Sequence, residues 1–151
     1  TLGKMLVAAT DKGVCRLSFE ENESELRARF PRADLVEGGA AFEKLLAEVV
    51  ANVEAPGSGA HIPLDVKGTA FQEACWEALR AIPPGETRSY GESAAAIGRP
   101  GAVRAAGSAC GDNRLAVLIP CHRVLRSDGA LGGYAWGLER KQALLAREKG
   151  K

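Results

Sequence analysis

The sequence predicts an α/β unit with a small antiparallel sheet over residues 1–62, followed by a mostly helical domain with a helix-turn-helix over residues 63–151. Three observations lead to this fold class. Apolar and polar residues alternate near the start of the chain, as in a half-buried hairpin. After residue 69, apolar residues recur at helical spacing. A loop rich in proline and glycine, residues 54–59, separates the two patterns and is the expected boundary.

The α/β unit is expected to begin with a β-hairpin. Residues 5–10 and 14–19 are predicted as strands, joined by a turn at Asp11-Lys12-Gly13. The second strand has an apolar face and a polar face, formed respectively by Cys15, Leu17 and Phe19 and by Arg16 and Ser18. We therefore expect one face of the hairpin to be buried, with Cys15 in the core.

Two helices and a further strand are predicted for the rest of this unit. Residues 20–29 run from acidic to basic, which suits a helix dipole, and Pro31 would end that helix. Residues 40–53 carry apolar side chains at helical spacing. Residues 62–66 are a candidate third strand.

The helical domain is expected to begin with a helix that Thr69 caps and Pro83 ends. The predicted buried stripe of this helix comprises Phe71, Cys75, Ala78, Leu79 and Ile82. Two shorter helices follow, over residues 90–97 and 102–110. A turn containing glycine joins them, which is the pattern of a helix-turn-helix.

The second helix of this pair carries one long side chain, that of Arg104, on a run of small residues: Ala102, Ala105, Ala106, Gly107, Ser108 and Ala109. Such a face allows either tight packing against another helix or close approach to a nucleic-acid groove. A protein that reads bases in the major groove usually displays several Arg, Asn or Gln side chains. Any contact with nucleic acid is therefore expected to be largely independent of base sequence.

A cysteine followed directly by a histidine stands at the end of an apolar run. Pro120 breaks the run 115–119, so Cys121 is expected on a bend at the end of a buried segment. The neighbouring His122 can lower the pKa of the thiol and make it a nucleophile. The alternative is a buried cysteine beside an incidental histidine. The last helix, predicted over residues 138–149, would leave Glu148 exposed unless it packs back on Cys121.

Composition places the chain among globular proteins. It has 151 residues, of which 46% are hydrophobic and 26% charged, and no apolar run approaches the roughly 20 residues of a membrane span. Four cysteines without paired spacing favour a reducing, cytoplasmic compartment. Residues 1–66 carry a net charge of −4 and residues 67–151 a net charge of +5, which hints at an anionic partner. A start at Thr1 is compatible with a piece of a longer protein.

The order of these features resembles the O6-alkylguanine-DNA alkyltransferase family, most closely the C-terminal half of Ada-type proteins. The resemblance rests on Pro120-Cys121-His122-Arg123-Val124 after a helix-turn-helix of small residues, and is strongest over residues 68–148. It implies irreversible transfer of the O6-alkyl group of guanine to the protein, once per molecule and without a cofactor. We then expect a ribonuclease H-like first unit, a winged-helix-like second domain, and a monomer that binds double-stranded DNA from the minor groove, at the nucleoid.

The resemblance also implies roles for individual residues. Cys121 would be the acceptor, His122 the base that acts through a water, and Glu148 the carboxylate that orients the histidine. Asn113 would hold the active-site turn, and Tyr90 would donate to guanine N3. Arg104 would fill the stack after the base is flipped, on the helix of Ala105, Ala106, Gly107, Ser108 and Ala109. The substrate pocket would comprise Val124, Ser127, Tyr134 and Trp136.

The implied chemistry is physically reasonable for these residues. Displacement at an alkyl carbon requires a soft nucleophile, and thiolate is the best that a side chain offers. A phenol can assist departure of the guanine anion. The target atom lies within the duplex, so the nucleotide must leave the stack.

Two departures from the family pattern lead to expectations of their own. Some relatives bind zinc in the N-terminal half, but only His61 and Cys15 fall near the relevant places, so we expect no metal. Trp136 replaces a small residue of some relatives, so we expect it to narrow the pocket and to slow reaction with bulky O6-benzylguanine.

Three alternatives remain open. A binding module for alkylated DNA would lack the acceptor thiol, against which Cys121 argues. A transcriptional regulator would require a separate zinc domain. A Cys-His hydrolase would require an oxyanion hole and a cleft for a peptide or ester, which nothing in the sequence indicates.

Overall fold

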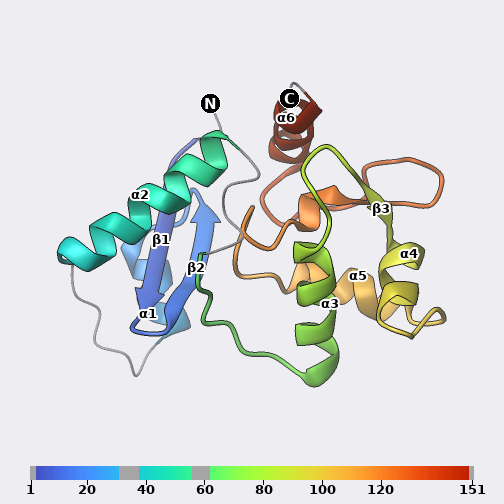
Figure 1. Ribbon diagram of the computed structural model, residues 1–151, viewed down its shortest axis with the longest axis horizontal. Helices are drawn as coiled ribbons and strands as arrows, with labels where there is room; N and C mark the ends of the chain where they lie inside the picture. The colour runs from blue at the N-terminus through green and yellow to red at the C-terminus, as the bar shows by residue number, and fades with distance from the viewer. Residues whose placement is uncertain (1–2, 31–37, 56–61, 150–151) are drawn as a thin grey trace.

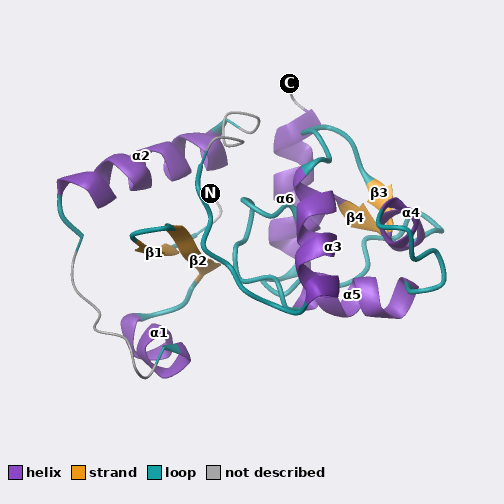
Figure 2. Cartoon of the chain, turned by 60° about the horizontal axis from the view of Figure 1, so that its bottom comes forward, coloured by secondary structure: helices purple, strands orange, loops and turns teal. Residues whose placement is uncertain are grey.

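The computed structural model describes residues 3–30, 38–55 and 62–149, and has an α/β part followed by a mostly helical part, as expected. In the first part a two-stranded antiparallel sheet lies between two helices (Figure 2). In the second part the helices gather on the other side of the molecule (Figure 1). The elements of the chain are β1 (Met5–Thr10), β2 (Gly13–Phe19), α1 (Glu23–Arg29), α2 (Ala40–Glu54), α3 (Ala70–Arg80), β3 (Arg88–Ser89), α4 (Tyr90–Ala96), α5 (Val103–Gly111), η1 (Cys121–Arg123), β4 (Val124–Leu125) and α6 (Leu138–Lys149).

The hairpin β1–β2 forms where it was predicted, and Leu17 and Phe19 are buried as predicted, but the faces before Arg16 differ from the prediction. The pairing shifts by one residue between Ala8 and Ala9, because Ala8 pairs with Arg16 and Ala9 with Val14. Cys15 is the extra residue of this bulge. A shift of one residue exchanges the two faces of a strand, so Val14 is fully buried and Cys15 is only half-buried. The placement of Cys15 in the core was therefore wrong.

The polar face of β2 is buried as well, which corrects the expectation of a hairpin with one solvent-facing side. Arg16 and Ser18 are buried, and both bond to the carboxylate of Glu21. Arg29, at the end of α1, donates to the same carboxylate at 3.0 Å. These partners outweigh desolvation and hold the pKa of Glu21 at about 2.

The two helices of the first part begin at identifiable caps. Asn22 caps α1 in a capping box with Glu25, so the helix starts three residues later than predicted. Helix α2 matches its prediction and buries Val49 and Val53. Pro31, His61 and most of the loop 54–59 lie outside the described residues.

Residues 62–66 do not form a regular strand, but they pair with β2. Leu64 and Val14 form an isolated parallel bridge. A second parallel bridge joins Leu17 to Leu115, with Leu17 donating to the carbonyl of Arg114 and accepting from the amide of Ala116. The middle of β2 is therefore hydrogen-bonded to the start of the apolar run that precedes Cys121. One hydrophobic core spans both parts of the chain.

Helix α3 follows its predicted cap. Thr69 and Gln72 form a capping box, and Cys75 and Leu79 are buried as expected. Sequence reasoning missed Trp76, which is also buried and donates from Nε1 to the carbonyl of Ala109 in α5 at 2.8 Å. This bond ties the first helix of the second part to the last helix of the predicted pair.

Helices α4 and α5 form the predicted helix-turn-helix. A parallel pairing that was not predicted, between β3 and β4, connects this pair to the segment after Cys121. Tyr90 follows β3 directly and is the first residue of α4, whose cap is Ser89. The short pairing therefore fixes the start of α4 beside the segment that follows Cys121.

The apolar run 115–119 is buried throughout, and Pro120 precedes a short 3₁₀ turn, η1, that begins with Cys121. Val117 within the run has φ of 68°, an unusual value for a β-branched residue. Helix α6 buries Leu144, whereas Leu145 is half-buried. None of the helices in the described ranges combines the length and the apolar character that crossing a membrane requires.

Replacing Trp76 by phenylalanine removes the bond between α3 and α5 and leaves the buried Ala109 carbonyl without that donor. We expect Trp76→Phe to lower the free energy of unfolding in urea by about 1–3 kcal/mol. The control is Trp136→Phe, which changes the second tryptophan, a half-buried one. Equal losses in the two variants would contradict a role for this bond.

Candidate active site

The short turn η1 begins with Cys121, whose thiol is buried. The side chain is 5% exposed, and Asn113 donates from Nδ2 to its Sγ at 3.2 Å. The same amide group donates to the carbonyl of Ile119, and its oxygen accepts from the amide of Leu115. Asn113 therefore bonds both to the thiol and to the backbone that leads to it.

The thiol is protonated at rest. Burial raises the pKa of Cys121 to about 11, although the bond from Asn113 and the nearby charge of Lys141 act in the opposite direction. Reaction at neutral pH therefore requires a base that removes the proton as the thiol attacks.

His122 has the geometry of such a base. Its side chain is fully buried, and Nε2 lies 2.8 Å from Oε2 of Glu148. Nδ1 is buried too, and has no hydrogen-bond partner within residues 3–30, 38–55 and 62–149. Burial is the main cause that lowers the pKa of His122. A neutral ring that donates from Nε2 to the carboxylate presents the lone pair of Nδ1.

Helix α6 packs back on the turn η1 and brings the carboxylate of Glu148 to it, the condition under which Glu148 was expected to matter. Glu148 is 3% exposed, and its bonds to His122 and Arg123 hold its pKa at about 2 against the effect of burial. Arg123 stands in the quoted motif, but no role was predicted for it. Its guanidinium bonds to the carboxylate through Nε and Nη2.

A cavity of about 240 Å³ opens in front of the thiol. Tyr90 and Tyr134 both line it, and the buried hydroxyl of Tyr134 lacks a partner among the described residues. The remaining lining residues are Gly107, Cys110, Gly111, Cys121, Gly133 and Ala135. Burial and the nearby Cys121 raise the pKa of Cys110 to about 12. Sequence reasoning did not place Cys110 here, and no local pattern would have shown that it shares a cavity with Cys121.

Tyr90 is positioned by a close approach of backbone. A Cβ atom at Gly132 would lie 3.2 Å from the Tyr90 hydroxyl, and Gly132 has φ of +70°. Both facts favour glycine at this position. Burial raises the pKa of Tyr90, so the phenol keeps its proton and can donate it.

Three predicted pocket residues do not line this cavity among the described residues. Val124 is fully buried in β4, and Ser127 is exposed on the following turn. Trp136 packs edge-on against Tyr134, with ring centroids 5.3 Å apart. Trp136 therefore adjoins this cavity through Tyr134 and is not among its lining residues. The slower reaction with bulky O6-benzylguanine stays a prediction.

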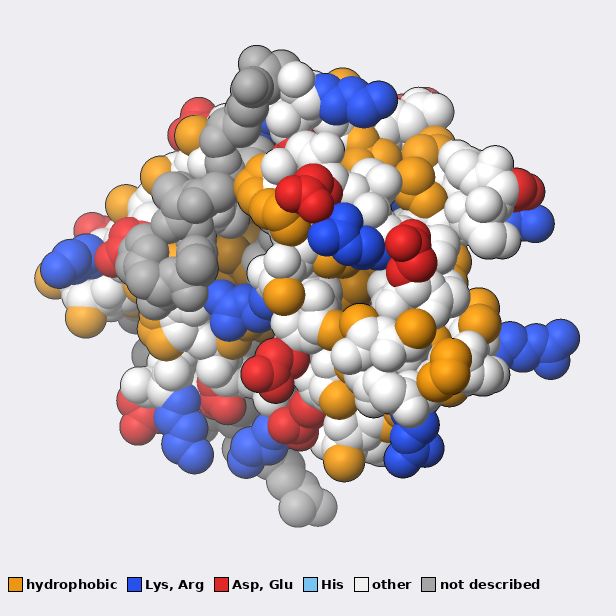
Figure 3. All heavy atoms as spheres, turned by 45° about the vertical axis from the view of Figure 1, so that its right-hand side comes forward, with side chains coloured by type: hydrophobic (Ala, Val, Ile, Leu, Met, Phe, Trp, Pro, Cys, Tyr) orange, Lys and Arg blue, Asp and Glu red, His pale blue; other side chains and the backbone are white. Residues whose placement is uncertain are grey.

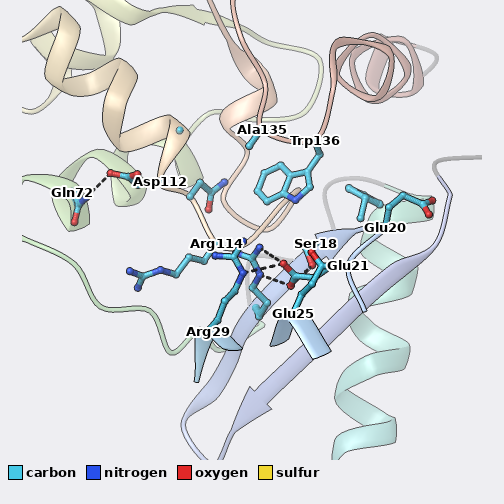
Figure 4. A pocket seen from close by; sticks show the side chains of 14 residues that line it. Ser18, Glu20, Glu21, Glu25, Arg29, Gln72, Asp112, Arg114, Ala135 and Trp136 are labelled. Atoms are coloured by element: carbon cyan, nitrogen blue, oxygen red, sulfur yellow. Dashed lines mark hydrogen bonds and ion pairs between the residues drawn. The ribbon is translucent and has the colours of Figure 1, made fainter. Parts of the chain in front are cut away.

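Trp136 instead lines a second cavity of about 530 Å³ between the two parts of the chain. Figure 4 shows its ring facing the ion pair of Glu21 and Arg29, with Asp112 and Arg114 on the adjoining side. Half of the residues that line this cavity are charged. It flanks the cavity at Cys121, because Gly111 and Ala135 line both.

Lys141 is a buried cation in α6 that sequence reasoning did not single out. It is 0% exposed, and Nζ donates to the carbonyls of Val124, Leu131 and Gly133. Three carbonyl acceptors match the three donors of an ammonium group. Lys141 thus holds the segment between β4 and α6 in place through these hydrogen bonds, and its positive charge lies near Cys121.

The predicted DNA-binding residues divide between two faces of α5. Arg104, Ala105 and Ser108 are exposed, and Gly107 is half-buried. Ala106 and Ala109 are 2% and 1% exposed, because they pack in a small core with Cys75 and Ala94. Their side chains are unavailable to a groove, which corrects the expectation that all these residues form one contact surface. On the side of the molecule that carries α4 and α5, basic side chains protrude singly among apolar surface (Figure 3).

No group of three or more His, Cys, Asp or Glu side chains in the described part of the chain could hold a metal ion. Of the two residues considered as zinc ligands, Cys15 is described and His61 is not.

Comparison with known proteins points to one family. The family model of the 6-O-methylguanine DNA methyltransferase DNA-binding domain matches residues 70–150. The bifunctional transcriptional activator/DNA repair enzyme Ada of Escherichia coli is 48% identical over 97% of this chain and 43% of its own length. A methylated-DNA–protein-cysteine methyltransferase of Methanosarcina barkeri is 43% identical over 98% of this chain and 92% of its own.

A solved structure extends this likeness to the fold. The OGT protein of Mycobacterium tuberculosis in complex with DNA superposes with a TM-score of 0.82 at 39% identity, over 97% of this chain and 86% of that one. The chain spans about half the length of several curated relatives that it matches, including 43% of Ada and 53% of a Mycolicibacterium paratuberculosis methyltransferase.

Replacing Lys141 by methionine would leave three backbone carbonyls without their donor and remove a cation near Cys121. We expect Lys141→Met to lower the free energy of unfolding by about 2–4 kcal/mol. It should also raise the pKa of Cys121, and so slow its modification by iodoacetamide several-fold at a fixed pH, as measured by peptide mass mapping. Lys149→Met, an exposed lysine of the same helix, is the control. Unchanged reactivity in a folded Lys141→Met protein would refute the electrostatic effect.

Proposed function

This chain belongs to the 6-O-methylguanine DNA methyltransferase family, and from that premise we propose that it repairs alkylated DNA directly. The O6-alkyl group of guanine in double-stranded DNA is transferred to Cys121, and the thioether is not removed. The protein is then a single-turnover methylated-DNA–[protein]-cysteine S-methyltransferase that needs no cofactor.

The observation that carries this proposal is the arrangement around the thiol. Cys121 faces a cavity, accepts a hydrogen bond from Asn113, and is followed by a buried histidine whose Nε2 is paired with Glu148. A thiol with a pKa of about 11 needs such a base to become a nucleophile at neutral pH. A cavity of about 240 Å³ leaves room in front of the thiol for part of a base.

The proposed reaction is a displacement at the alkyl carbon. Nδ1 of His122 takes the thiol proton through a water, and Glu148 stabilises the imidazolium that forms. The sulfur of Cys121 bonds to the alkyl carbon as the bond from that carbon to guanine O6 breaks. The electron pair of the broken bond stays on guanine. Tyr90 donates to guanine N3 and limits the charge that develops there.

Recognition is proposed to require a flipped nucleotide. The exposed part of α5, with Ala105, Gly107 and Ser108, approaches the minor groove, and Arg104 fills the gap in the stack. The relative from Mycobacterium tuberculosis was crystallised with DNA and shares the fold, which supports DNA as the partner. We propose that a monomer binds in this way, in the cytoplasm and at the nucleoid.

The first part of the chain, residues 1–62, is proposed to support the acceptor domain, residues 63–151. The bridge from Leu17 to Leu115 carries that support to the segment before Cys121. We further propose that the supporting unit is ribonuclease H-like and the acceptor domain winged-helix-like. The β3–β4 pairing beside the helix-turn-helix supports the second assignment.

Mixing the protein with duplex DNA that carries one O6-methylguanine should add one methyl group per molecule and then stop. Intact-protein mass spectrometry measures the gain, and peptide mapping should locate it on Cys121. Cys121→Ser should show no gain while it still binds the DNA. Tight binding without a mass change in the wild-type protein would point instead to a damage-recognition module, and repeated turnover to a hydrolase.

Arg104 should matter only when a base must leave a duplex. We expect Arg104→Ala to slow methyl transfer from duplex DNA by at least about tenfold, because the cost of unstacking is no longer offset. Transfer from free O6-methylguanine base should stay unchanged. Arg27→Ala, which changes an exposed arginine of α1, should affect neither reaction.

The affinity of the protein for DNA should fall as the salt concentration rises. An affinity that does not depend on salt would argue against an electrostatic interface.

A further inference from the structure

The carboxylate of Glu148 is shared between two partners on the acceptor turn. His122 Nε2 lies 2.8 Å from Oε2, and Arg123 Nη2 lies 2.7 Å from the same oxygen. Arg123 Nε lies 3.0 Å from the other oxygen, Oε1. The guanidinium thus spans both oxygens of the carboxylate, whereas the imidazole meets one.

The guanidinium is held in that position. Its Nη1 donates to the carbonyl of Ile82, just after α3, at 2.6 Å. Arg123 is 7% exposed, so water competes little for its donors. An arginine keeps its charge at any pH at which the protein is folded, and its planar fork matches a carboxylate. The positive charge of Arg123 therefore balances the negative charge of Glu148 even when His122 is neutral.

We propose that Arg123 is a positioning residue that offsets the charge of Glu148 and thereby keeps His122 neutral, with its proton on Nε2 and Nδ1 free to act as the base. A carboxylate paired with a histidine alone favours the imidazolium, which has no lone pair to accept a proton. With Arg123 in place, the carboxylate of Glu148 still orients the imidazole ring. The ring does not have to carry a positive charge to balance the carboxylate. The consequence for alkyl transfer rests on the proposed function.

The charged groups around the ring support this assignment. Glu148 and Lys141 face His122 from α6, and Arg123 and the thiol of Cys121 belong to its own turn. Burial lowers the pKa of His122, Glu148 raises it, and the charges of Arg123 and Lys141 lower it. Removing Arg123 would leave Glu148 as the dominant charge beside the ring.

The protein has only two histidines, His61 and His122, so nitrogen-15 NMR can follow both rings in one titration. In the wild-type protein His122 should be the Nε2-protonated tautomer and titrate below about 6.5, the value of an unperturbed histidine. An imidazolium at pH 7 would overturn the proposal without any variant. In Arg123→Gln the pKa of His122 should rise, because the charge of Arg123 no longer lowers it. Because a raised pKa means more imidazolium at a given pH, methyl transfer should slow at neutral pH and recover at alkaline pH, about tenfold per pH unit below the new pKa.

Arg126→Gln is the matched control, because this arginine of the following loop is largely exposed and should leave the titration of His122 unchanged. Arg123→Lys keeps the positive charge, and should move the pKa of His122 less than glutamine does. If Arg123→Gln does not fold, the wild-type tautomer and the lysine variant still decide the question. A slower reaction with an unchanged pH profile and an unchanged His122 titration would reduce Arg123 to a purely structural role. Absence of methyl transfer in the wild-type protein would refute the proposed function, whereas the NMR titration would still test Arg123.

Discussion

A single buried carboxylate, that of Glu148, determines much of the architecture around the acceptor. A carboxylate without partners is costly to bury, and the last turn of α6 packs with Glu148 bonded to both His122 and Arg123. Arg123 in turn reaches the end of α3 through the carbonyl of Ile82. One charge therefore ties the C-terminal helix, the acceptor turn and the first helix of the second part together. The thiol is positioned by the same contacts that satisfy this charge.

Much of the fold could be predicted because it follows from local patterns. Capping residues and apolar spacing located α3 within a residue or two, and alternation located the hairpin. The burial of Leu17 and Phe19 in β2 was predicted, but that of Val14 in place of Cys15 could not be, because the bulge at Cys15 exchanges the faces before it. The burial of Arg16 could not be predicted either, since it depends on a carboxylate five residues away that folds back over the strand. The pairing of β3 with β4 involves two residues on each strand, which is too short to leave a periodic signal.

The candidate site divides in a similar way. The motif around Cys121 is contiguous, and so its chemistry could be inferred from sequence, whereas the partners from distant segments needed the resemblance or the structure. Glu148 lies 26 residues from His122, and nothing in the helix pattern separates it from an exposed glutamate. Lys141 looks like a solvent-facing position, yet three carbonyls of the preceding loop surround its amine. Cys110 reaches the acceptor cavity only because α5 turns that face toward Cys121.

The raised pKa of the acceptor has a meaning for a protein that is consumed by its own reaction, as proposed here. Each molecule of such a protein can react only once, so its thiol must stay unmodified until the protein binds damaged DNA. A thiol with a pKa of about 11 that is 5% exposed reacts slowly with the oxidants and electrophiles of its surroundings. In the proposed reaction, activation of the thiol is left to His122. Burial of Cys121 thus protects the thiol from side reactions for longer, but it also makes the resting thiol a weaker nucleophile.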